Sequence, residues 1–96
     1  MDSTEALARI RAAASASPAR VDMSELHAIK RARERKIQRG DVLHCLKMAQ
    51  DCEPDPIPGR WKVKGGDLDG DTLTLVVTIE EVLRGGDRVV LITGYD

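Results

Sequence analysis

Three prolines in the middle of the chain separate two halves whose apolar residues repeat with different periods. Pro54, Pro56 and Pro58 lie in the stretch 51–59, which we interpret as an extended linker because proline cannot continue a helix. Before this stretch the apolar residues recur every three or four positions, as in amphipathic helices. After it they alternate with polar residues, as in strands. This order predicts an α+β domain in which helices precede a sheet.

Three segments of the first half are predicted to be helices. Residues 3–15 are rich in alanine, a strong helix former, and are followed by Ser17 and Pro18, which end the helix. Residues 24–36 and 39–49 carry apolar side chains along one stripe of the helical surface. The alanine-rich surface of residues 3–15 specifies its own docking only weakly.

The second half is predicted to form a small antiparallel sheet. Three segments are rich in β-branched residues or alternate strictly, namely 60–64, 72–79 and 88–95. Glycine-containing turns at 65–71 and 85–87 connect them, and connections this short join antiparallel neighbours. We therefore expect two to three helices packed on a sheet of three strands, or of four if one more segment joins it.

Charge is distributed unevenly along a chain whose net charge is only −1. Residues 20–47 contain eight Lys or Arg against four acids, whereas residues 48–96 contain five against ten. Such asymmetry can place a basic surface on a nearly neutral protein. Trp61 and Tyr95 are the only aromatic residues, which argues against stacking of bases on an aromatic platform.

Cysteine and metal chemistry are not indicated. Cys45 and Cys52 lack the paired spacing of a zinc site, so we expect no metal and no cofactor. The acidic turn from Asp67 to Asp71 lacks the glycine that follows the third Asp of a calcium loop, and Thr78 stands where that loop has its glutamate, so we interpret the turn as a hairpin loop. The sequence contains no export signal and no long apolar run, so we expect a cytoplasmic protein without membrane contact.

Short motifs along residues 24–96 resemble the bacterial domain-of-unknown-function family 4258. Members of that family typically show a His-Ala pair, an Arg four residues after the His, a second Arg four later, an Ile, and then an Asp-Val helix. Their strand pair ends in Thr-x-Tyr. The matching residues here are Leu26-His27-Ala28, Arg31, Arg35-Lys36-Ile37, Asp41-Val42 and Leu46, and in the second half Gly70, Leu73, Val76-Val77 and the stretch 90–95. A glycine often occupies the position of Lys36 in the family.

The resemblance implies a fold and a class of function. The family is grouped with the RelE/ParE-like toxins, many of which cleave RNA without a metal. It implies a single RelE-like domain at residues 23–96, preceded by an N-terminal helix and linker at 1–22. The function implied is an RNA-cleaving or RNA-binding module, with RNA and an antitoxin or other protein as partners, as a monomer or homodimer. A non-catalytic protein-interaction module of the same fold is the alternative.

Candidate site residues follow from the chemistry of metal-free RNA cleavage, which needs proton transfer and a cation at the phosphate. His27 is the candidate for proton transfer, and Arg31 and Arg35 for phosphate binding. Tyr95 is a candidate to position the phosphate or to orient the imidazole. Four further residues are candidates for nucleic-acid binding on the strands, namely Arg60, Lys62, Lys64 and Thr93.

Each candidate also has a structural interpretation. His27 is equally suited to capping or packing, and Arg31 and Arg35 to ion pairs with Glu34 or with acids of the sheet. Lys62 and Lys64 are typical of a solvated strand face, and Tyr95 of a cover over the end of the core. His44 is predicted to be exposed on its helix.

Overall fold

Helices occupy the first half of the chain and strands the second, apart from one two-residue strand. The computed structural model describes residues 1–82 and 85–95. In chain order the elements are α1 (Ser3–Ala16), the 3₁₀ helix η1 (Pro18–Arg20), β1 (Val21–Asp22), the 3₁₀ helix η2 (Leu26–Ala28), α2 (Lys30–Glu34), α3 (Arg39–Lys47), β2 (Asp51–Pro54), β3 (Arg60–Gly66), β4 (Thr72–Val82) and β5 (Gly86–Tyr95). The predicted α+β class and its order of helices before sheet are confirmed.

The sheet has five strands in the order β1-β5-β4-β3-β2, with β1 parallel to β5 and the other neighbours antiparallel. The prediction of three or four antiparallel strands is therefore wrong in number and in direction. β1 is only two residues long, too short to show an alternating pattern. β2 lies inside the stretch interpreted as a linker, because its prolines suggested an extended segment without partners. Pro54 is tolerated because it ends an edge strand.

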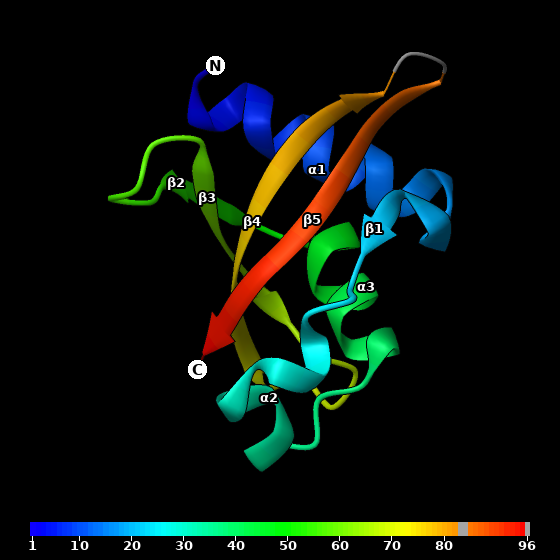
Figure 1. Cartoon of the computed structure of the whole chain (residues 1–96), viewed down its shortest axis with the longest axis vertical. Helices are drawn as coiled ribbons and strands as arrows, with labels where there is room; N and C mark the ends of the chain where they lie inside the picture. Colours follow the sequence, from blue (N-terminus) through cyan, green and yellow to red (C-terminus); the bar gives the residue numbers. More distant parts are fainter. Residues whose placement is uncertain (83–84, 96) are drawn as a thin grey trace.

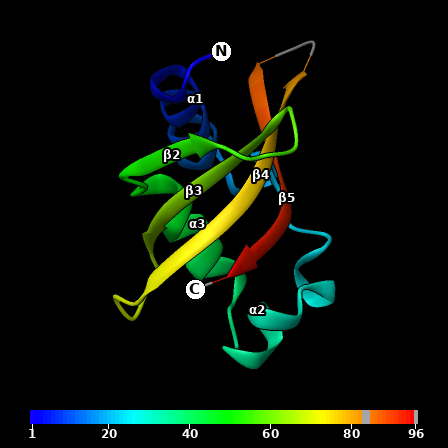
Figure 2. The same cartoon turned by 90° about the vertical axis from the view of Figure 1, so that its left-hand side faces the viewer.

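The helices α1 and α3 cover one face of the sheet. Figure 1 shows α1 crossing behind β4 and β5 and α3 beside β5, and in the turned view of Figure 2 the strands lie in front of α3. The opposite face of these strands carries no helix within the described part of the chain (Figure 2). Figure 1 shows α2 apart from these two helices, beside the carboxyl end of β5.

The core lies between the sheet and the helices that cover it. Its largest fully buried side chains come from both layers, with Ile10 from α1, Leu46 from α3 and Leu91 from β5. Alanines of α1 are buried beside Ile10, so this helix packs closely against its neighbours. Asp2 caps α1 by accepting a hydrogen bond from the Glu5 amide at 2.8 Å.

A bidentate ion pair fixes α1 to the start of β5. Arg9 donates from Nε to Asp87 Oδ2 at 2.8 Å and from Nη2 to Asp87 Oδ1 at 2.5 Å. These bonds hold the pKa of Asp87 below its usual value. Such two-fold geometry is the strong form of an arginine–carboxylate pair. It adds directional contacts to a helix whose alanine surface specifies docking poorly.

The helix predicted at 24–36 is broken into η2 and α2. Ile29 lies between them in an extended conformation, with φ −81° and ψ 109°. A 3₁₀ turn repeats every three residues, so Leu26 and Ile29 still point to the same side, and both are buried. The helical apolar spacing therefore identified the inward residues correctly, although the backbone is not one continuous helix.

Lys36 ends α2 in the left-handed region, with φ 57°. The amide of Ile37 donates to the Ala32 carbonyl at 2.8 Å, and the amide of Lys36 donates to the Arg33 carbonyl at 3.2 Å. This is the Schellman arrangement, whose left-handed position favours glycine. A side chain with a Cβ atom is strained there.

Replacing Lys36 with glycine is expected to stabilise the fold by about 0.5–1 kcal/mol, because relief of the left-handed strain outweighs the greater freedom of the unfolded chain. Urea unfolding measures this as a higher midpoint at constant slope. The matched control is Lys47→Gly at the end of helix α3, which should destabilise by up to about 1 kcal/mol. A loss of stability in Lys36→Gly would contradict the assignment of strain.

Candidate nucleic-acid interface

Strand register places the predicted strand residues on the uncovered face of the sheet. Residues paired across neighbouring strands point to the same face. Lys62 pairs with Val76, which pairs with Thr93, and Lys64 is connected to Tyr95 in the same way through Thr74. Arg60, two residues before Lys62 on β3, lies on the same face. The structure therefore brings together Arg60, Lys62, Lys64, Thr93 and Tyr95.

Lys62 is a half-buried cation of this face. Its Nζ lies 6.0 Å from the centre of the Tyr95 ring and 3.8 Å from Glu53 Oε1. Interaction with Tyr95 is the main cause that raises the pKa of Lys62, and Glu53 adds to it. The ammonium group therefore stays charged near neutral pH, beside the one aromatic ring of the face.

Carboxylates are interleaved with these cations. Glu53 lies opposite Lys62 on the neighbouring strand, and Asp51 lies opposite Lys64 in the same register. Further along the sheet, Arg88 donates from Nη2 to Glu80 Oε2 at 2.6 Å. The uncovered face is thus mixed in charge, with only a small excess of cations on its strands.

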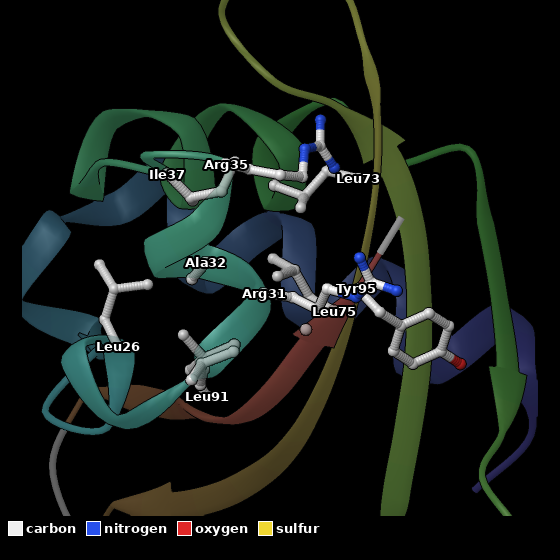
Figure 3. Close-up of a pocket in the computed structure, with 11 residues that line it drawn as sticks. Leu26, Arg31, Ala32, Arg35, Ile37, Leu73, Leu75, Leu91 and Tyr95 are labelled. Carbon is white, nitrogen blue, oxygen red and sulfur yellow. The ribbon is translucent and has the colours of Figure 1, made fainter.

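A narrow apolar crevice separates α2 from the carboxyl end of the sheet. Its volume is about 10 Å³, about the space of one water molecule. Arg31, Arg35 and Tyr95 line it together with apolar residues of both sides, and Figure 3 shows the two arginines reaching from α2 toward the strands. The crevice is too small to admit a nucleotide. Its rim, however, brings Arg31 and Arg35 to the same end of the sheet as Tyr95.

The two arginines at this rim have different environments. Arg35 donates from Nη2 to Asp67 Oδ2 at 3.1 Å and from Nη1 to the Thr72 carbonyl at 3.1 Å. Its side chain is only 20% exposed, and that of Asp67 is 5% exposed. Arg31 is 63% exposed and has a longer contact of 3.7 Å with Glu34. Arg35 therefore anchors α2 to the loop between β3 and β4, whereas Arg31 is open to a ligand.

His27 stands apart from the other candidates. It is exposed, does not line the crevice, and its imidazole has no hydrogen bond or ion pair to any residue that the structure describes. The structure groups Arg31, Arg35 and Tyr95 at the crevice. It does not place His27 with them.

His44 is placed differently from its prediction as an exposed residue. It is half-buried, and its Nδ1 lies 3.0 Å from the carbonyl oxygen of Gly66. A carbonyl only accepts hydrogen bonds, so Nδ1 carries the proton of this contact. Helical periodicity placed His44 on the polar side of α3, but it gave no sign that the end of β3 approaches that side.

The loop between β3 and β4 is organised by hydrogen bonds to Asp67. Asp67 Oδ1 accepts hydrogen bonds from the amides of Asp69 and Asp71, both at 2.9 Å. The Asp67 amide donates to the Asp71 carbonyl at 2.9 Å, which closes the loop as a hairpin. Its interpretation as a hairpin loop is confirmed. Across the described residues, no three His, Cys, Asp or Glu side chains cluster as a metal site would need.

Both thiols are unsuited to nucleophilic chemistry. Burial raises the pKa of Cys45 to about 12 and that of Cys52 to about 11. A thiol is a nucleophile only as a thiolate, so neither is activated. Neither cysteine forms a disulfide.

Comparison with known proteins gives no relative for this chain. No family model matches it, and no curated protein or solved structure is significantly similar to it. None of the helices in residues 1–82 and 85–95 has the length and apolarity to span a membrane.

Proposed function

We propose that this chain is a RelE/ParE-like domain related to family 4258, and that it binds single-stranded RNA on the uncovered face of its sheet. The observation that carries the proposal is the gathering of cations around one ring. Lys62 and Lys64 of β3 share a face with Tyr95, and Arg31 reaches the same end of the sheet from α2. Cations track the phosphates, and one exposed ring gives one stacking position.

Binding is better supported than cleavage. Cleavage needs a proton acceptor and a cation within reach of the same phosphate. His27 lies on a separate turn, and Arg35 is engaged by Asp67 and the Thr72 carbonyl. The proposed role is therefore that of an RNA-binding module that lacks the nuclease constellation of its fold.

The first test removes the cations of the face. The double variant Lys62→Ala/Lys64→Ala is expected to weaken binding of single-stranded RNA about tenfold. It should also reduce the slope of log affinity against log salt by about 1.4, since each phosphate contact contributes about 0.7 to this slope. Fluorescence anisotropy over a salt series measures both. The control Arg11→Ala/Lys47→Ala removes two exposed charges from the helices and should leave the binding unchanged.

The second test separates binding from cleavage. Incubation of wild-type protein with RNA in the presence of a chelator is expected to leave the RNA intact, and His27→Ala should behave identically. Cleavage by the wild type that falls at least about a hundredfold in His27→Ala would instead restore the nuclease hypothesis.

A non-catalytic protein-interaction module is the second candidate. The observation that supports it is that Glu53 and Glu80 alternate with the cations of the face. A face of mixed charge complements a protein partner better than a polyanion such as RNA. Absence of RNA binding by the wild type, together with a homodimer or a captured protein partner, would favour this candidate.

A further inference from the structure

Helix α2, its connection to α3 and the first residue of α3 form the most basic part of the chain. Residues 30–39 contain six Lys or Arg and a single acid, Glu34. Arg33, Lys36 and Arg39 of this segment, here named the basic turn, are exposed, and none of them forms an ion pair within the part of the chain that the structure describes. Three unpaired cations within seven residues repel one another. An anion that binds between them would relieve this repulsion.

Lys36 adds an independent observation. It occupies the left-handed position of the Schellman turn, where glycine is favoured, and its side chain is exposed. Its ammonium group has no partner among residues 1–82 and 85–95 that would compensate for the strain. The hydrogen bonds of the turn account for the backbone conformation, but they do not explain why a lysine stands where glycine is favoured. Strained non-glycine residues of this kind are common at functional positions.

We propose that the basic turn is a second phosphate-binding site, which extends the path of a single RNA strand from the sheet face over α2. This inference rests on the proposed RNA binding at the face. Arg31 and Arg33 are two residues apart on α2, so they project about 200° apart around the helix axis. Arg31 lines the crevice together with Tyr95, whereas Arg33 is exposed and does not line it. A strand that contacts both must cross the helix.

The chemistry of the basic turn suits a nucleic-acid backbone better than a membrane or a protein. No exposed large apolar side chain lies between residues 30 and 40 that could enter a bilayer or fill a pocket of a partner. Two of the three cations are arginines, whose planar groups bind phosphate oxygens in pairs. Phosphate contacts of this kind increase affinity without reading the sequence.

The expected signature is a dependence on RNA length. Single-strand sites on small domains span about 4–16 nucleotides, so an oligonucleotide of about 4 engages the face alone and one of about 12 also reaches the basic turn. Wild-type protein should bind the longer RNA at least about tenfold more tightly. Affinity for the longer RNA should fall about threefold in Lys36→Gly and about tenfold in Arg33→Ala/Lys36→Gly. Both variants should bind the short RNA as the wild type does.

The test measures both RNAs by anisotropy, and vesicles of anionic lipid by co-sedimentation, with wild type, Lys36→Gly, Arg33→Ala/Lys36→Gly, Lys36→Gln and Lys47→Ala. Gln removes the charge but keeps a side chain that is strained in the left-handed conformation, so Lys36→Gln and Lys36→Gly together separate the loss of charge from the relief of strain. Lys47→Ala removes one exposed lysine of α3 and should change neither affinity.

Three results would overturn the inference. Unchanged binding of the long RNA by both Lys36 variants would overturn it while leaving the proposed function standing. If the Lys36 variants lose binding to vesicles of anionic lipid but still bind the long RNA as the wild type does, the basic turn would be assigned to a membrane surface instead. Failure of the wild type to bind either RNA would remove the proposed function and this inference together.

Discussion

Replacing Asp67 with alanine is expected to lower the free energy of unfolding by about 2–4 kcal/mol, because one buried carboxylate organises three groups at once. Its Oδ1 accepts from the amides of Asp69 and Asp71, and its Oδ2 accepts from Arg35. Alanine leaves two loop amides without their acceptor and removes a charged partner of a guanidinium that is only 20% exposed.

The same carboxylate connects the two halves of the chain. Arg35 is 32 residues away from Asp67 in sequence, at the end of α2. The loop that contains Asp67 also contacts the start of α3. There the amide of Leu68 donates to Asp41 Oδ1 at 3.0 Å, while Asp41 Oδ2 accepts from the Gln38 amide at 2.8 Å and so caps α3. Loss of Asp67 is therefore expected to loosen α2 as well as the loop.

Urea unfolding and hydrogen exchange measure the two effects of Asp67→Ala. Exchange should accelerate at the amides of α2 and of the loop more than at those of β4. Asp69→Ala is the control, because its exposed side chain accepts no hydrogen bond from any described residue, and it should change stability by less than about 0.5 kcal/mol. Equal losses in the two variants would show that the loop and not the carboxylate is responsible.

Alternation of apolar residues predicted the central strands well, because each of these strands has one face in the core. Residues 60–64 and 72–79 lie inside β3 and β4, and 88–95 lies inside β5. The same alternation correctly placed Lys62 and Lys64 on the face away from the helices. A pattern of period two reports burial directly, so it predicts which residues share a face.

The remaining features depend on partners distant in sequence. β1 is a strand only because Val21 and Asp22 meet β5 almost 70 residues later. The candidate trio of His27, Arg31 and Arg35 assumed one continuous helix, and the extended Ile29 separates the first of these from the others. An ion pair between Arg35 and an acid of the sheet was one interpretation of the sequence, but neither residue carries a local sign that the acid is Asp67, in the loop between β3 and β4.

Gly65 marks the closest approach between a helix and the sheet. A Cβ atom at this position would lie 2.7 Å from the carbonyl oxygen of Cys45 and 3.2 Å from its Sγ. The first of these atoms belongs to the backbone of α3, which cannot move aside as the end of a side chain can. The approach of α3 to β3 that buries Cys45 and Leu46 therefore requires glycine here.

Gly65→Ala is expected to cost about 2–3 kcal/mol, because α3 must shift away from β3 and loosen the core beneath it. Gly66→Ala is a control in the same strand, since a Cβ there would meet nothing closer than the Asp71 carbonyl oxygen at 3.9 Å. Neither glycine has a positive φ, so conformational freedom is not the difference between them. Thermal unfolding of the two variants separates the effect of close approach from that of strand propensity. Only Gly65→Ala should melt well below the wild type. Equal melting temperatures would show that α3 can shift away from β3 without loss of stability.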